Sequence, residues 1–276
     1  MNTAALVLGF LTLALLGFYA ATLVDPTPLM ADFPPGAPPL RVAVVYWGLP
    51  RSLRYVLPNH REKIFEPMEK QGLVYKTFFH TYRAREDFSS SWEGGDEARS
   101  GDESLLQADV QLVDDRDSAL RQIESMDLIP SRDPFATFDP DLPFRTFRNM
   151  CLALRSKKLA WQQARREVFD VYLFLRPDVH FRHTLDPRAL LHASRRPKEV
   201  LVPHFGWADG VNDRMAVCHP LAAEAYVGAF DDLADKRELY SEVRLLDALR
   251  QRRVRPVSFK MFFWRVRGNG STCHYD

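Results

Sequence analysis

Cysteine is scarce in this sequence, with three residues (Cys151, Cys218 and Cys273) among 276. Because an odd number allows at most one internal disulfide, bridges do not form the scaffold of the fold. An excess of one charge is also lacking, since 37 lysines and arginines face 36 aspartates and glutamates. The net charge of +1 gives no electrostatic basis for binding nucleic acid, so we expect no such partner. Internal repeats and heptad runs are absent too.

Basic residues are missing from the first 40 positions, which contain no lysine or arginine. Residues 4–24 form an uncharged run of 21 residues, long enough for a helix to cross the ~30 Å hydrocarbon core of a bilayer. A cleaved signal peptide, the alternative, needs a basic segment before the apolar run and small residues before the cut. Phe18 and Tyr19 lie where those small residues should be. We therefore predict a transmembrane signal anchor over residues 1–24.

The anchor leaves everything that follows it on one side of a membrane. The distribution of lysine and arginine does not specify the orientation, because neither flank carries a nearby basic residue. A very short N-terminus before a large C-terminal part is the layout of a single-pass type II enzyme. We therefore expect a membrane protein of the Golgi or another secretory-pathway membrane, with a lumenal domain.

Proline is concentrated in residues 25–40, which favours an extended and semi-rigid backbone. The six prolines are Pro26, Pro28, Pro34, Pro35, Pro38 and Pro39. Next to a membrane span, this composition predicts a stem that holds the following domain clear of the bilayer. A recognition segment for a small adaptor domain is the alternative.

Residues 41–276 have the length and the pattern of one α/β domain. Short apolar runs at 42–47, 73–79 and 170–175 predict buried strands, and segments of helical periodicity separate them. This alternation predicts right-handed crossovers and a doubly wound, mostly parallel sheet flanked by helices. Residues 83–117 are rich in Asp, Glu, Ser and Gly, and we predict a flexible insertion there.

Candidate site residues follow the predicted strand at 170–175, since such sheets bind ligands beyond the carboxyl ends of their strands. Pro177 ends this strand and places Asp178 at its tip. Asp178 and His180 together could present a carboxylate and an imidazole to one divalent ion. A turn-capping aspartate and a surface histidine are the alternative. A carboxylate at a strand tip is expected to pack little, so its removal should leave the stability of the metal-free protein unchanged.

The anchor, the stem and the triplet Asp178-Val179-His180 after a hydrophobic strand resemble a type II glycosyltransferase of the GT-A fold. Five short segments are similar to a group of single-pass glycosyltransferase-like proteins. They are Gly48-x-x-Arg51-Ser52, Phe79-His80-Thr81-Tyr82, residues 172–178, Val211-Asn212-Asp213-Arg214 and Arg265-x-Arg267-x-Asn269-Gly270. The resemblance extends over most of residues 41–270. It implies a GT-A-like domain, a nucleotide-sugar donor, a glycan or glycoconjugate acceptor, and Mn²⁺ or Mg²⁺ at the donor.

This resemblance assigns Asp178, His180 and His274 as metal ligands. The ion would bridge phosphate oxygens of the donor and neutralise the departing diphosphate. Arg51 and Arg176 are the expected cationic contacts to the donor, beside Asp178. The alternative for Arg51 is a surface arginine at a helix start, and the alternative for His274 is a frayed terminus.

An inverting transfer also needs a general base near the acceptor hydroxyl. Asp213, in a polar loop before a predicted strand, is one candidate, and Glu242, on a predicted helix, is another. A turn in which Asp213 pairs with Arg214 and a solvated helix glutamate are the alternatives.

Two other classes of function remain open. Pro50-Arg51-Ser52 resembles the start of a phosphate loop in a sulfotransferase, but Leu53 and Arg54 follow where such loops need small residues. The other interpretation is a lumenal carbohydrate-binding protein without catalytic activity. Binding of a sulfonucleotide against UDP- or GDP-sugars would separate the three.

Overall fold

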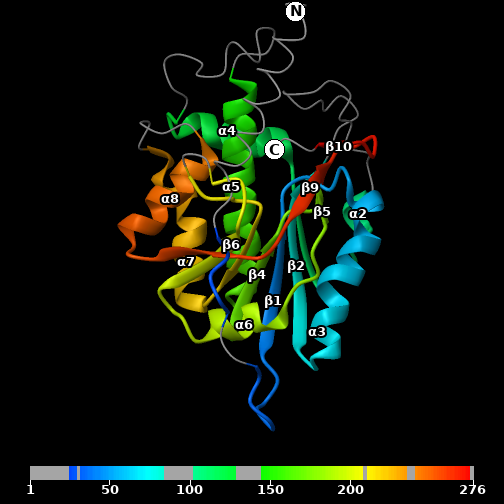
Figure 1. The fold of residues 1–276 in the computed structure, drawn as a ribbon. Helices are drawn as coiled ribbons and strands as arrows, with labels where there is room; N and C mark the ends of the chain where they lie inside the picture. Colours follow the sequence, from blue (N-terminus) through cyan, green and yellow to red (C-terminus); the bar gives the residue numbers. More distant parts are fainter. Residues whose placement is uncertain are drawn as a thin grey trace, which may run out of the picture.

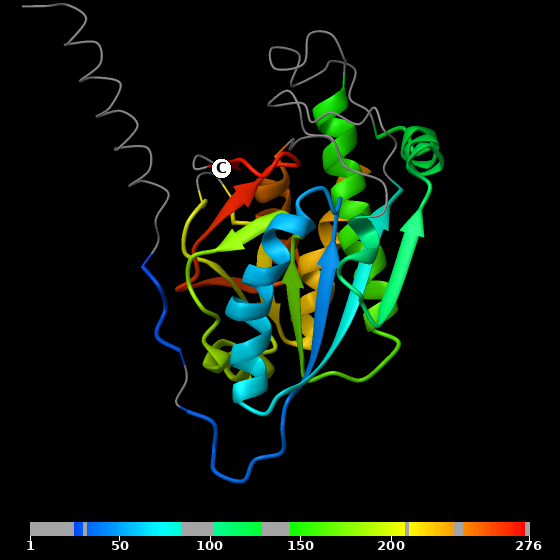
Figure 2. The ribbon, with the colours of Figure 1, turned by 90° about the vertical axis from the view of Figure 1, so that its right-hand side faces the viewer.

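The computed structural model describes residues 25–29, 32–83, 102–128, 144–207, 210–234 and 240–273. In this part of the chain, helices cover both faces of a central β-sheet (Figure 1). Figure 2 shows the same layers after a quarter turn. The predicted α/β class, with a mostly parallel sheet flanked by helices, is therefore confirmed.

The central sheet has seven strands among the described residues, in the order β3-β2-β1-β4-β7-β6-β8. Neighbouring strands run parallel except at β7, which is antiparallel to both β4 and β6. The strands are β1 (Arg41–Trp47), β2 (Val74–Tyr82), β3 (Val110–Asp114), β4 (Val171–Leu175), β6 (Glu199–Pro203), β7 (Met215–Cys218) and β8 (Arg255–Phe259). A small antiparallel sheet contains β5 (Val179–Phe181), β9 (Phe263–Val266) and β10 (Thr272–Cys273).

The helices form one layer on each face of the sheet. The first layer contains α5 (Arg145–Ala164), α7 (Pro220–Val227) and α8 (Ser241–Gln251). The second contains α2 (Leu53–His60), a π-helical turn (Arg61–Phe65), α3 (Glu66–Lys70) and α6 (Pro187–Ser194). Outside these layers, α4 (Arg116–Ser125) packs against α5, and short 3₁₀ helices cover Asp102–Ser104 and Gly228–Ala234.

The continuous apolar run of β1 follows from this layering. Successive side chains of a strand point to opposite faces, so Val44 packs in the core beneath α2 and Val45 packs in the core beneath α5. Both side chains are fully buried. A strand in the middle of a parallel sheet has no solvent face, which explains why polar residues do not interrupt this run.

The order of the strands reverses between β1 and β4. From β1 the chain proceeds to β2 and β3 on one side, whereas β4 lies on the other side with β7, β6 and β8. Because β1 and β4 are parallel, their carboxyl ends meet at the same edge of the sheet. Open α/β sheets bind ligands in the crevice outside such a reversal point.

The segment before β1 is described from residue 25 onward, apart from residues 30 and 31. Thr27 donates its N–H to the carbonyl of Ser258 on β8 at 2.9 Å, and the Ser258 hydroxyl donates to the Asp25 carbonyl at 2.5 Å. Leu29 and Phe33 pack against the hydrophobic core. The contacts of residues 25–29 and of Phe33 therefore place this part of the predicted stem against the domain, whereas residues 34–39 are exposed.

The predicted transmembrane anchor, residues 1–24, lies outside the described residues. Among the residues that are described, no helix is both long enough and apolar enough to cross a membrane. The anchor therefore stays a prediction from the sequence.

The segment predicted as a flexible insertion, residues 83–117, contains a strand of the sheet. Val110–Asp114 is β3, which pairs in parallel with β2 at the edge. Asp109, just before it, accepts hydrogen bonds from the backbone N–H and the hydroxyl of Thr77, at 2.7 and 2.6 Å. The prediction of a flexible segment is wrong for these residues. The periodicity was weak because β3 is an edge strand, none of whose residues is fully buried.

Candidate active site

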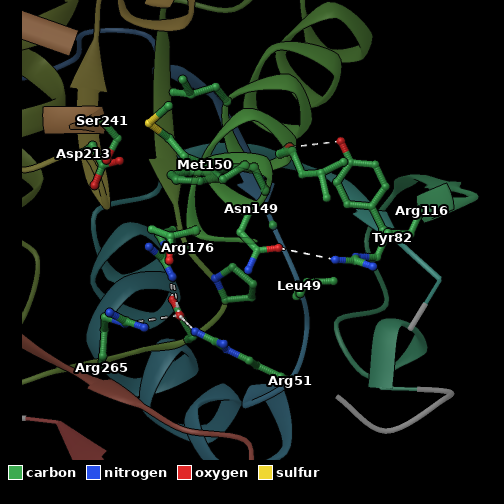
Figure 3. A pocket seen from close by; sticks show the side chains of 18 of the residues that line it. Leu49, Arg51, Tyr82, Arg116, Asn149, Met150, Arg176, Asp213, Ser241 and Arg265 are labelled. Carbon is green, nitrogen blue, oxygen red and sulfur yellow. Dashed lines mark hydrogen bonds and ion pairs between the residues drawn. The ribbon is translucent and has the colours of Figure 1, made fainter. Parts of the chain in front are cut away.

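A pocket lies beyond the carboxyl ends of β1 and β4, where the strand order reverses (Figure 3). The described residues enclose a cavity of about 220 Å³. Its walls come from the ends of β1 and β2, the β1–α2 loop, the β4–β5 loop and the loop before β7. The first residues of α4 and α8, the first half of α5, and β9 with the residue after it complete the lining. The charged side chains of the lining are Arg51, Arg116, Arg176, Arg265, Arg267, Asp178 and Asp213. Arginines thus outnumber aspartates, which makes the pocket suited to an anion.

The loop after β1 directs Arg51 into the pocket. It turns at Gly48, whose φ of +98° lies in the region that favours glycine. The Gly48 N–H donates to the Ser156 hydroxyl on α5 at 2.9 Å, and this hydroxyl donates to the carbonyl of His80 at 2.9 Å. Ser52 then starts α2 and donates its hydroxyl to the Val266 carbonyl. The loop is therefore tied to α5 on one side and to β9 on the other.

Asp178 contacts three arginines, Arg51, Arg176 and Arg265. Figure 3 shows these arginines converging from different sides. Arg176 donates to both carboxylate oxygens, from Nε to Oδ1 at 2.9 Å and from Nη2 to Oδ2 at 2.5 Å. Arg51 donates from Nη2 to Oδ2 at 3.2 Å, and Arg265 Nε lies 3.6 Å from Oδ2. Burial alone would raise the pKa of Asp178, but the charges of these arginines hold it well below its usual range.

The hairpin of β9 and β10 brings Arg265 and Arg267 to the same pocket. Val266 donates its N–H to the Asp178 carbonyl at 2.8 Å, which joins β9 to the start of β5. The chain reverses at Gly270, where φ is +87° and the N–H donates to the Arg267 carbonyl at 2.8 Å. The arginines around Asp178 therefore come from segments that are far apart in sequence, and the small sheet brings Arg265 to the tip of β4.

Four of the predicted site residues line this one pocket, namely Arg51, Arg176, Asp178 and Asp213. His180 does not join them, because it lines a separate depression with Glu62 and Lys63. His274 lies outside the described residues.

The predicted metal site does not fit the residues that the structure describes. Within the described ranges, no group of three His, Cys, Asp or Glu side chains could hold a metal ion. Both oxygens of Asp178 already accept hydrogen bonds from guanidinium groups. The structure does not bring Asp178 and His180 together as a ligand pair, because they line two different pockets.

Asp213 is fixed in the pocket wall by its neighbours in the loop. A Cβ atom at Gly210 would lie 2.4 Å from the Glu242 carbonyl oxygen, so only glycine allows this loop to approach α8 so closely. The buried Asn212 accepts from the Arg214 N–H at 3.1 Å, and the Tyr226 hydroxyl donates to the Asp213 carbonyl at 2.8 Å. The carboxylate is thus held on a rigid part of the domain, beside Ser241 in Figure 3.

The charges around Asp213 keep its carboxylate ionised. Burial acts to raise its pKa, but the charges of Arg214, Lys157 and Arg176 bring it below its usual value. Arg214 Nη1 lies 3.8 Å from Asp213 Oδ1 and 3.4 Å from Glu242 Oε1. Asp213 therefore both lines the pocket and takes part in an Asp–Arg contact. Glu242, the other candidate base, contacts Arg214 and Ser241 and is not among the lining residues.

Lys157, in the middle of α5, is a charged group that the sequence analysis did not single out. Its side chain is fully buried, with Nζ 4.9 Å from the centre of the Trp47 ring and 4.4 Å from that of Tyr226. Its ammonium group has no hydrogen-bond partner within the described part of the chain. Burial lowers the pKa of Lys157 to about 8, although the charge of Asp213 acts in the opposite direction.

Replacing Lys157 with methionine is expected to raise the free energy of unfolding by roughly 1–3 kcal/mol at neutral pH. The pKa is about 8 in the folded protein and about 10.4 in the unfolded chain, so below pH 8 the fold bears a buried charge. Between these values the unfolded state binds more protons, and the cost disappears as the pH rises. Urea unfolding at several pH values checks this: the advantage of Lys157→Met should shrink above about pH 8. A constant advantage, or a loss of stability, would contradict it.

Arg265 and Arg267 were named in the sequence only as part of a motif, without a role in the site. The β9–β10 hairpin pairs with β5 and so brings these two arginines to the pocket. No sequence pattern indicated that Arg116 and Asn149 belong to the site, because nothing in the sequence shows that α4 and α5 meet at the pocket. They contact each other at 3.4 Å across its rim.

Comparisons with known proteins do not assign a function to this pocket. No protein-family model matches the chain, and no curated protein sequence is significantly similar to it.

Proposed function

We propose that this protein transfers a sugar from a nucleotide-sugar donor to a glycan or glycoconjugate acceptor. The observation that carries the proposal is the pocket at the reversal point of the sheet, where Arg51, Arg176 and Arg265 converge. Nucleotides bind at such points in open α/β sheets. Guanidinium groups bind phosphate oxygens through paired N–H donors. The diphosphate of the donor lies against these arginines in the proposed complex.

The proposed reaction breaks the bond between the sugar C1 and a diphosphate oxygen and forms a bond from C1 to the acceptor oxygen. The negative charge that develops on the leaving diphosphate is stabilised by the arginines, which are already oriented by their contacts with Asp178. The proton of the acceptor hydroxyl passes to a base, and Asp213 is the ionised group on the other side of the pocket. This assignment requires an inverting transfer.

The finer fold assignment and the cellular location are part of the same proposal. A GT-A-like domain is supported by the parallel strands β1 and β4 and by the Arg176-Pro177-Asp178 element at the tip of β4. Anchoring in a Golgi or other secretory-pathway membrane, with the domain in the lumen, is supported by the uncharged run at residues 4–24.

Binding of radiolabelled nucleotides to the purified full-length chain tests this proposal. We expect a UDP-sugar or a GDP-sugar to bind and its nucleoside diphosphate to compete with it. Arg51→Ala should weaken this binding by roughly tenfold, the scale of one lost charge-assisted hydrogen bond. Binding of a sulfonucleotide in preference to every nucleotide sugar would indicate a sulfotransferase. Binding of free glycans with no nucleotide would indicate a non-catalytic carbohydrate-binding protein.

A further inference from the structure

The surroundings of Asp178 differ from those of a metal ligand, because its carboxylate is buried among arginines. Its side chain is 2% exposed, and its two oxygens lie within 3.6 Å of nitrogens from Arg51, Arg176 and Arg265. A divalent cation at this carboxylate would have to approach to about 2.0–2.6 Å, in the midst of three guanidinium charges. Like charges at such distances repel strongly where water is excluded.

We propose that Asp178 is a positioning residue that assembles these arginines into a diphosphate-binding cluster, and that the pocket binds its nucleotide without a divalent cation. This inference rests on the proposed function, because it concerns the same pocket. It assigns the neutralisation of the diphosphate to the three side chains that meet at Asp178.

The chemistry of the three arginine side chains supports this role. A guanidinium is a planar, permanently charged group with five N–H donors and no acceptor, so three of them side by side favour an anion. Phosphate oxygens are the complementary acceptors, because two parallel N–H groups of one guanidinium can bind two of them. The side chains of Arg51, Arg176 and Arg265 are 9%, 20% and 14% exposed, and all three line the cavity.

The positions of the arginines are fixed before any ligand binds. Arg176 lies over the Trp47 ring, with its guanidinium carbon 5.6 Å from the ring centre. Arg265 is held by the pairing of β9 with both β5 and β10. Arg51 precedes Ser52, whose hydroxyl bonds to the backbone of β9. A ligand therefore meets side chains that have already lost most of their rotamer freedom, and this lowers the cost of binding.

Cationic groups also surround the second carboxylate of the pocket. Asp213 is the other carboxylate of the lining, and the charges that lower its pKa are those of Arg214, Lys157 and Arg176. Among the described residues, no group of three or more His, Cys, Asp or Glu side chains could hold a metal ion. The donor set in this part of the chain thus suits an anion.

Calorimetric titration of the full-length chain with UDP and with GDP, in EDTA and in Mn²⁺, tests the inference. The dissociation constant of the nucleotide that binds is expected to agree within about twofold in the two buffers. Arg265→Ala should raise it by roughly ten- to a hundredfold in EDTA. Arg255→Ala, at the opposite end of the sheet and paired with Glu199, is the matched control and should have no effect.

Asp178→Asn separates positioning from a purely structural role. At a temperature where circular dichroism shows the variant folded, its affinity in EDTA should fall by roughly tenfold, because the arginines lose their common partner. Wild-type affinity in the folded variant would overturn the positioning role. Binding that EDTA abolishes and Mn²⁺ restores would overturn the metal-free site and leave the proposed function intact. If neither nucleotide nor its sugar conjugates bind in either buffer, both proposals fail.

Discussion

Replacing Asp178 with alanine is expected to lower the free energy of unfolding by about 3–5 kcal/mol, even in EDTA and without nucleotide. The physical reason is that the substitution leaves Arg51, Arg176 and Arg265 close together without the carboxylate that now compensates them. This result is the opposite of the expectation for a loosely packed carboxylate at a strand tip. Urea unfolding of the full-length chain measures it.

The matched control for this prediction is Asp247→Ala, which removes an exposed carboxylate that pairs with Arg250 on α8. Exposed pairs of this kind contribute little, so its stability should stay within about 0.5 kcal/mol of wild type. The pH dependence gives a second check. Because the pKa of Asp178 is lowered in the folded state, its contribution is present above about pH 4 and is lost as the pH falls further. Equal stability of Asp178→Ala and wild type at neutral pH would contradict this account.

Asp213→Asn is expected to lower the rate of sugar transfer by roughly 10²–10⁴-fold, the usual contribution of a general base. Asparagine keeps the shape of the side chain and the packing of the loop around Asn212, but it cannot accept the proton of the acceptor hydroxyl. The affinity for the nucleotide should change little, because the phosphates bind to the arginines beside Asp178. Initial rates at saturating donor, together with a binding isotherm, measure the two effects separately.

Glu242→Gln is the control for Asp213, since Glu242 contacts Arg214 but does not line the pocket. Its transfer rate should stay within about threefold of wild type, well short of the loss of a base. If Asp213→Asn loses nucleotide binding or fails to fold, Asp213 belongs to the donor site or to a structural contact with Arg214. If the rate is unchanged in a folded variant, another group accepts the proton.

The sequence predicted the centre of the sheet better than its edge. The runs predicted at 42–47 and 170–175 correspond to β1 and β4. These strands have neighbours on both sides and helices on both faces, so residues 42–47 and 171–175 are all apolar. The edge strand β3 was missed, because an edge strand with partly exposed residues has no such pattern. The rule that such sheets bind ligands beyond the carboxyl ends of their strands therefore located the pocket, because this rule needs only the central strands to be predicted correctly.

The roles of the site residues were harder to predict than their location. Asp178 was found from its place after β4, but its partners Arg51 and Arg265 come from chain segments that only the three-dimensional fold brings together. Without them, a carboxylate at a strand tip is indistinguishable from a metal ligand. Lys157 was hidden for a similar reason, since a lysine on an amphipathic helix is usually solvated, and only the packing shows that this one lies under Trp47 and Tyr226.

The most direct test of the central claim is a turnover assay of the purified full-length chain with a panel of UDP- and GDP-sugars and a mixture of glycan acceptors. Release of nucleoside diphosphate and formation of a product heavier by one sugar are followed by mass spectrometry. At a donor concentration well below saturation, the account predicts one active donor, transfer by Arg265→Ala that is slower by roughly ten- to a hundredfold, and normal transfer by the control Arg255→Ala. Transfer by Arg265→Ala at the wild-type rate under these conditions, or a panel with no active donor and no bound nucleotide, would contradict a nucleotide-sugar site at the arginine cluster.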